Sequence, residues 1–119
     1  TISGQLPRSD DGLITGVLGN GTSIDRGVLA ARQCAVAILA VLNEALVGDA
    51  ERLAGCVQLC GFVQSARGFT EHSTVLNGAS DLVAAVLGDR GRHARTAVGV
   101  ASLPFGVAVE VSAQFRLHG

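Results

Sequence analysis

The sequence contains no lysine, tyrosine, tryptophan or methionine among its 119 residues. Without lysine, the protein cannot form a Schiff base with a carbonyl substrate or with pyridoxal phosphate. Without tyrosine or tryptophan, and with only four phenylalanines, it lacks the usual aromatic platform for stacking single-stranded nucleic acid. The net charge of −1 also provides no basic surplus to neutralise phosphates. We therefore expect no nucleic-acid partner.

Long apolar runs are also absent from the sequence. The longest uninterrupted one, over residues 35–42, has about eight residues, whereas a helix needs about 20 to cross a bilayer, so we expect no membrane partner. The chain does not begin with methionine, and we expect that a natural N-terminal segment is missing. Apolar residues make up 48% of the sequence, which is enough to build the core of a single domain over residues 1–119.

The cysteines are three in number, and an odd count favours free thiols in a reducing compartment. We therefore expect a cytoplasmic protein. Cys56 and Cys60 lie four residues apart in an apparent strand, so their Cα atoms would be roughly 13 Å apart, whereas a disulfide needs less than about 7 Å. We predict that both pack in the core, together with Cys34. The histidines lack metal-ligand spacing, and we expect neither a metal nor a cofactor.

Hydrophobic periodicity predicts helices interleaved with strands. Apolar residues at three- and four-residue spacing predict a helix over 24–47, capped by Thr22 or Ser23. A second, weaker helical pattern covers 73–87, although the Asn77–Gly78 pair within it could instead form a turn. Strands are predicted over 1–6, 13–18, 53–65, 94–101 and from 107 onward.

This order of elements predicts an α+β fold in which crossovers place both helices on one face of a sheet. In the last two strands, the face rich in β-branched residues is predicted to pack against the helices. The opposite face then carries mostly small residues and two charges, namely Arg95, Ala97, Gly99, Ala108, Glu110 and Ser112. A half-apolar second face of this kind favours packing between subunits.

Arg95 and Glu110 are the most informative pair, since both are predicted to lie on that second face among small neighbours. A guanidinium in a partly dry pocket binds a carboxylate bidentately, and a carboxylate in the same space can take or deliver a proton. The alternative is a structural salt bridge between the two strands. The basic cluster over 90–95 likewise permits a solvated loop with one buried member, a nucleic-acid patch, or a ligand or metal site.

Two motifs near the ends of the chain carry a family resemblance. Ser3-Gly4-Gln5-Leu6-Pro7 lies near the start, and Arg95-Thr96-Ala97-Val98-Gly99-Val100 is followed by Leu103-Pro104 and Val109-Glu110-Val111. Together they resemble the Rid family, the reactive intermediate imine deaminases formerly called YjgF proteins. The resemblance runs from Thr1 to about Leu117, and the segments 77–82 and 91–95 resemble one branch of the family.

The resemblance implies a chorismate-mutase-like fold with a mixed β-sheet, assembled as a homotrimer with clefts between subunits. In such a cleft Arg95 would hold the substrate carboxylate, and Gly4 and Ala97 would supply backbone contacts. Glu110 would position or activate water, and Asn77 would line the cleft. Ala97 stands where founding members carry a cysteine.

The implied reaction is the hydrolysis of reactive 2-imino or enamine acids to 2-keto acids and ammonia. It needs no metal and no covalent nucleophile, because an imine carbon is already electrophilic. The alternative is a trimer that binds a small carboxylate in the same cleft without chemistry.

Overall fold

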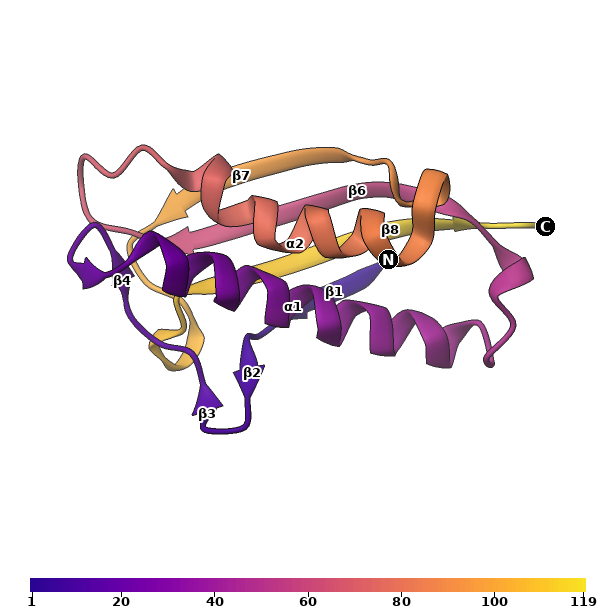
Figure 1. Cartoon of the computed structure of the whole chain (residues 1–119), viewed down its shortest axis with the longest axis horizontal. Helices are drawn as coiled ribbons and strands as arrows, with labels where there is room; N and C mark the ends of the chain where they lie inside the picture. Colours follow the sequence, from indigo (N-terminus) through magenta and orange to yellow (C-terminus); the bar gives the residue numbers. More distant parts are fainter.

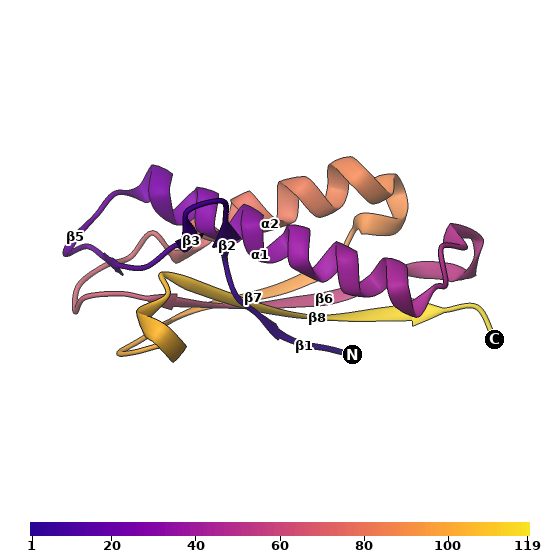
Figure 2. The ribbon, with the colours of Figure 1, turned by 90° about the horizontal axis from the view of Figure 1, so that it is seen from below.

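A four-stranded sheet with two helices on one of its faces forms the body of the protein (Figures 1 and 2), as the computed structural model of residues 1–119 shows. The strands lie in the order β1 (Ile2–Gln5), β8 (Val109–Leu117), β6 (Leu53–Gln64) and β7 (Ala94–Val100). β7 runs parallel to β6, whereas β8 runs antiparallel to both β6 and β1. The mixed sheet and the α+β class are therefore confirmed.

The remaining elements connect the sheet and the helices. Between β1 and the first helix lie four two-residue strands, β2 (Arg8–Ser9), β3 (Gly12–Leu13), β4 (Val17–Leu18) and β5 (Gly21–Thr22), where a single run over 13–18 was predicted. Three short 3₁₀ turns follow later in the chain: η1 (Ala50–Arg52), η2 (Gly88–Gly91) and η3 (Pro104–Gly106). Figure 2 shows the η3 segment on the side of the sheet away from the helices.

Helix α1 (Ile24–Ala45) begins at Ser23, whose hydroxyl accepts a hydrogen bond from the backbone N–H of Arg26 at 3.1 Å. By length and composition α1 could cross a bilayer, with a mean hydropathy of 1.5, although it contains no long uninterrupted apolar run. Its buried residues are Gly27, Ala30, Ala31, Cys34, Ala35, Ile38 and Leu42. They recur every three or four residues and form one stripe against the sheet, so α1 serves as a core helix.

Helix α2 (His72–Leu87) continues without interruption through Asn77 and Gly78, so the alternative of a turn there is wrong. Gly78 lies against the backbone carbonyl of Val28 in α1, and a Cβ at this position would overlap that oxygen. The missing side chain lets the two helices cross closely, which outweighs the low helix propensity of glycine.

Strand β6 lies at the centre of the sheet, as its two apolar faces predict. Leu59 and Val63 are fully buried beneath the helices. Gly61 lies between them on the same face, directly under Leu76 of α2, whose side chain a Cβ would overlap. The helix-facing side of the sheet is therefore filled partly by the helix's own side chains.

A bulge between Cys56 and Gln58 breaks the alternation of β6. Cys56 is consequently buried and Val57 is 45% exposed, the reverse of strict alternation through the strand. All three cysteines are free. The predicted core position is confirmed for Cys34 and Cys56, but Cys60 is only half-buried.

The predicted orientation of β7 is wrong. Ala97 is paired with Gly61 of β6, so Arg95, Ala97 and Gly99 all face the helices. The β-branched residues Thr96, Val98 and Val100 face the other way, and Val98 is 41% exposed. α2 approaches the small residues of this strand closely: a Cβ on Gly99 would lie 2.6 Å from the imidazole Nε2 of His72. In β7, the face with small residues therefore lies under α2, because it leaves room for the helix, and the face with β-branched residues does not.

Candidate functional site

Arg95 lies between β7 and α2, where three groups of the helix accept hydrogen bonds from its guanidinium. Nη1 donates to Asn77 Oδ1 at 2.8 Å and to Ser80 Oγ at 3.2 Å. Nη2 donates to the backbone carbonyl of Ser73 at 3.3 Å. The structure thus brings together Arg95 and Asn77, two of the residues that the sequence singles out.

These contacts leave one edge of the guanidinium free. Arginine carries five N–H donors. The two on Nη1 and one on Nη2 are taken by α2, whereas the Nε–H and the second Nη2–H of Arg95 have no partner in the chain. Adjacent donors of this kind grip a carboxylate in the bidentate manner. The site is therefore suited to a small anion with planar oxygens.

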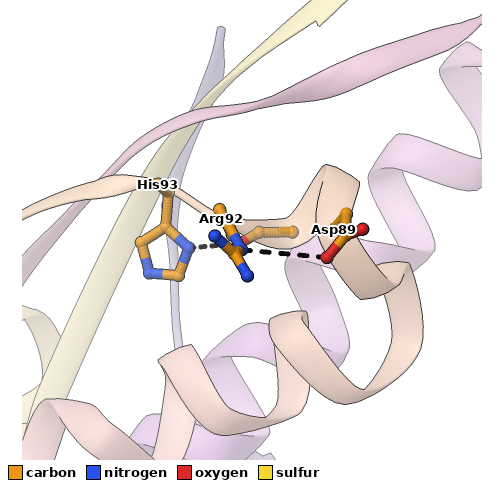
Figure 3. A network of polar contacts seen from close by, with 4 residues as sticks. Asp89, Arg92 and His93 are labelled. Atoms are coloured by element: carbon orange, nitrogen blue, oxygen red, sulfur yellow. Dashed lines mark hydrogen bonds and ion pairs between the residues drawn. The ribbon is translucent and has the colours of Figure 1, made fainter.

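Ser80 also connects Arg95 to His93. The imidazole Nδ1 lies 2.6 Å from the carbonyl oxygen of Gly91 (Figure 3), and Nε2 lies 2.9 Å from Ser80 Oγ. Sequence analysis missed both residues, although spacing offered a signal. Ser80 is three residues after Asn77 on one helix face, and His93 is two residues before Arg95 in the strand direction.

The rest of the basic cluster serves the loop before β7. Arg90 Nη1 donates to the carbonyl oxygens of Ala50 and Leu53, at 2.8 and 3.2 Å, and so ties η2 to the start of β6. Arg92 is exposed and lies 3.8 Å from the carboxylate of Asp89 (Figure 3), the only ion pair in the chain. Arg90 and Arg92 are exposed, in line with a solvated loop, but the cluster has no single buried side chain, because His93 and Arg95 are both half-buried.

Glu110 lies on the other face of the sheet. It is paired with Phe62, whereas its neighbours Val109 and Val111 are buried beneath the helices. Its carboxylate rests against Gly4, where any Cβ would overlap Oε2. The open face, as we call the side of the sheet that bears Glu110 and Phe62, therefore unites Glu110 with Gly4.

Arg95 and Glu110 consequently do not share a face within one chain, in contrast to the prediction. They form no salt bridge, so the structural alternative is also wrong. Ala97 lies beside Arg95 on the helix side, half-buried against the core. The predicted site residues thus fall into two groups, Arg95, Asn77 and Ala97 on one side and Gly4 and Glu110 on the other.

The cavities of the chain lie away from both groups. The larger one, of about 220 Å³, sits between the C-terminal ends of α1 and α2 beside Leu46 and Leu87. The smaller one, of about 100 Å³, lies next to Ile2 and Phe115. Neither contains Arg95 or Glu110, so a single chain does not enclose a pocket around them.

The buried thiols are unsuited to nucleophilic chemistry. Burial raises the pKa of Cys34 to about 12 and the pKa of Cys56 to about 11. Both stay protonated at neutral pH, and the thiolate is the reactive form of cysteine. Neither cysteine lies in the Arg95 group or in the Glu110 group.

Comparison with known proteins places the chain in a family. Residues 1–113 match the family model described as "YjgF/chorismate_mutase-like, putative endoribonuclease". The curated protein TCP17 from Trypanosoma cruzi is 50% identical over 119 residues, an alignment that covers 98% of this chain and 74% of the relative.

Solved structures agree with this match. Atu1372 from Agrobacterium tumefaciens, a protein of unknown function, superposes with a TM-score of 0.93 at 45% identity, covering 98% of this chain and 76% of its own. A Shewanella oneidensis protein described as "a putative endoribonuclease" gives 0.85 at 30% identity, covering 92% and 72%.

A more distant relative carries the Rid name itself. YyfA from Yersinia pestis, a Rid-family protein of unknown function, gives a TM-score of 0.59 at 26% identity, covering 93% of this chain and 74% of its own. The chain therefore belongs to the YjgF/chorismate-mutase-like family, the family of the Rid proteins.

Proposed function

We propose that the protein hydrolyses reactive 2-imino or enamine acids to 2-keto acids and ammonia in a cleft between the subunits of a homotrimer. Arg95 of one subunit binds the substrate carboxylate, with Asn77 and Ala97 beside it. Gly4 and Glu110 of the next subunit complete the cleft. The proposal includes a cytoplasmic location, in keeping with the free thiols.

The observation that carries this proposal is the free edge of Arg95. α2 holds the guanidinium through Nη1 and Nη2 but leaves the Nε–H and one Nη2–H unpaired. A carboxylate that accepts from these two donors is fixed in direction as well as in position. The carbon next to it, which is the reacting carbon of a 2-imino acid, is thereby oriented.

Glu110 supplies the remaining chemistry in this proposal. Water adds to the C=N carbon, and the carboxylate takes one proton from that water. Glu110 passes this proton to the nitrogen, which gives the neutral aminoalcohol adduct. It then transfers the remaining hydroxyl proton of the adduct to the nitrogen as the C=O bond of the keto acid forms, the C–N bond breaks and ammonia leaves. No covalent intermediate with the protein is needed, in agreement with the protonated state of the buried thiols.

The need for a second subunit follows from the arrangement within one chain. Arg95 faces the helices and Glu110 the open face, and neither borders a cavity. The open face also exposes apolar side chains, among them Val57 at 45% and Val98 at 41%. Covering these side chains with another copy stabilises a closed assembly and brings Glu110 to a neighbour's Arg95.

A mixed-subunit assay tests this arrangement directly. Imines are generated by an amino-acid oxidase, and the release of keto acid is followed with wild-type, Arg95→Ala and Glu110→Gln proteins. Each variant alone is expected to be inactive while it remains a trimer. After the two variants are unfolded and refolded together in equal amounts, about one cleft in four would combine an intact arginine with an intact glutamate. Wild-type turnover in Arg95→Ala would exclude binding of the substrate carboxylate by Arg95. Refolded mixtures without any activity would indicate that Arg95 and Glu110 act within the site of one subunit.

Carboxylate binding without turnover is the second candidate function, because the free edge of Arg95 supports binding by itself. Small keto acids would then raise the melting temperature through mass action, in wild type but not in Arg95→Ala, with no acceleration of imine hydrolysis. A flat thermal shift across a panel of keto acids would count against both candidates.

The printed descriptions of the family model and of one relative name an endoribonuclease. For this chain the net charge of −1 and the absence of tyrosine and tryptophan favour a small-molecule ligand over RNA. RNA cleavage that co-purifies with the trimer and disappears in Arg95→Ala would reverse this preference.

A further inference from the structure

We propose that Ser80 and His93 are positioning residues that select which edge of the Arg95 guanidinium faces the ligand. This inference rests on the proposed role of Arg95 as the carboxylate clamp. It adds two residues to the site, one from the middle of α2 and one from the turn before β7.

The imidazole of His93 is held in one tautomer. The carbonyl oxygen of Gly91 can only accept a hydrogen bond, and His93 Nδ1 lies 2.6 Å from it (Figure 3). In the neutral ring Nδ1 therefore carries the proton, and Nε2 carries a lone pair. The turn that ends η2 thus fixes the tautomer of His93.

The tautomer of His93 sets the direction of the Ser80 hydroxyl. Because Nε2 of His93 can only accept, Ser80 must donate its O–H proton along the 2.9 Å contact to the ring. The lone pairs of Oγ are then left to accept from Arg95 Nη1, 3.2 Å away. The chain of hydrogen bonds runs in one direction, from Arg95 through Ser80 to His93 and on to Gly91.

The oriented hydroxyl of Ser80 in turn holds the guanidinium of Arg95. A serine hydroxyl can rotate, and a hydroxyl that pointed its proton at Nη1 would repel the guanidinium instead of holding it. His93 removes this freedom. With Nη1 fixed by Ser80 and Asn77, the guanidinium cannot turn over, and the Nε edge remains the one presented.

The burial of the three side chains agrees with this role. Ser80, His93 and Arg95 are all half-buried, and Arg92 next to His93 is turned away toward Asp89. The network is thus partly shielded from water, which strengthens its hydrogen bonds, and no carboxylate neutralises Arg95 within the chain. The positive charge of Arg95 stays available to a ligand.

Kinetics on the trimer provide the first test. Ser80→Ala is expected to raise KM for a 2-imino acid about tenfold and to change kcat by less than about twofold. The reason is that the hydrogen bonds from Arg95 to the substrate carboxylate weaken equally in the ground state and in the transition state. Ser80→Thr keeps the hydroxyl and is expected to restore KM. His93→Ala, which acts through Ser80, is expected to raise KM by about threefold. Thr74→Ala, an exposed hydroxyl on the same helix, is the matched control. A fall in kcat with unchanged KM would contradict a positioning role.

A double-mutant cycle tests whether Ser80 acts through Arg95. With 2-oxobutyrate as the probe, Ser80→Ala is expected to weaken binding in wild type and to have no further effect in the Arg95→Ala background. An equal loss in both backgrounds would show that Ser80 contributes by another route and would overturn the proposal.

Nitrogen NMR of the unliganded trimer separates this proposal from the proposed function. With histidine labelled, and with His93→Ala to assign its signals, the neutral ring of His93 is expected to carry its proton on Nδ1 and a lone pair on Nε2. The opposite tautomer, or rapid averaging between the two, would refute the network whether or not the protein turns over imines. The expected tautomer in a protein without imine turnover would instead support the network and reject only the proposed reaction.

Discussion

The two faces of the sheet carry different kinds of residue where β7 lies at its edge. On the helix side, small residues let α2 lie close to the strands: Gly61 is covered by Leu76, and Gly99, although exposed, lies against the imidazole of His72. On the open face, β7 carries branched residues such as Val98, whose side chain is 41% exposed in the chain. The comparison teaches that a close helix needs room beneath it, whereas an uncovered branched face offers apolar surface to another subunit.

The polar residues follow the same division. On the helix side, Arg95 is held by hydrogen bonds to α2, and on the open face Glu110 rests against Gly4. One face thus carries a preorganised cation, and the other carries an acid that a second copy would bring to it.

The largest expected effect is the loss of the proposed trimer when a charge is placed on the open face. Val98→Asp is expected to yield monomers, because a carboxylate buried in an apolar interface without a partner costs several kcal/mol. Val36→Asp on α1 is a matched control, since Val36 is 45% exposed. Light scattering with size-exclusion chromatography measures the result. A trimer that survives Val98→Asp would show that the open face is not the interface.

Thiol labelling compares the faces through their cysteines. At pH 8 Cys34 and Cys56 are expected to resist alkylation, because burial raises the pKa of both thiols and shields them. Cys60, which is half-buried, is expected to react at least about tenfold faster in Val98→Asp than in wild type, where the proposed assembly would cover it. Mass spectrometry identifies the labelled residue. Equal labelling of Cys60 in both proteins would argue that nothing covers this part of the open face.

Filling the space beneath α2 is expected to destabilise the helix side. A Cβ at Gly61 overlaps the side chain of Leu76, so Gly61→Ala should lower the free energy of unfolding by about 1–3 kcal/mol. Gly55→Ala in the same strand is the control. Its Cβ would lie 3.5 Å from the carbonyl oxygen of Arg90, an ordinary contact, and should change stability by less than about 0.5 kcal/mol. Denaturant unfolding of both variants at equal protein concentration provides the comparison.

The smallest effect concerns alkaline pH. The pKa of Cys34 is raised from 9.0 to about 12, so the folded state keeps its proton at a pH where the unfolded chain loses it. The stability from this neutral thiol is complete below pH 9 and falls as pH rises above it. By pH 10 the loss is about 1 kcal/mol. Between pH 7.5 and 10, the free energy of unfolding should therefore fall by about 1 kcal/mol more in wild type than in Cys34→Ala. An identical pH dependence would contradict the raised pKa.

Local pattern was enough to predict most elements. The predicted helix over 24–47 and the observed α1 differ by two residues at the C-terminal end, where Val47 and Gly48 adopt positive φ angles. The long central strand was predicted from its two apolar faces. The bulge at Cys56 was not, because an extra residue in one strand is defined only by its pairing with another.

The site was predicted only in part. Strand alternation identified Arg95 and Glu110, and the family resemblance added Gly4, Asn77 and Ala97. The structure places Arg95 and Asn77 in contact. Ser80 and His93 were missed, because hydroxyl and imidazole side chains become informative only when a fold brings helix and strand together.

By itself, the sequence determined the two helices, the long strands β6, β7 and β8, and the alternation of faces along β7 and β8. It also determined the chemistry available, which is an arginine and an acid with no lysine. Only the tertiary structure decided which face of β7 lies under α2, and hence that Arg95 and Glu110 point in opposite directions. The physical reason is that alternation defines two sides but not which one is covered. That choice depends on contacts between residues far apart in the chain, such as Gly61 with Leu76 and Gly99 with His72.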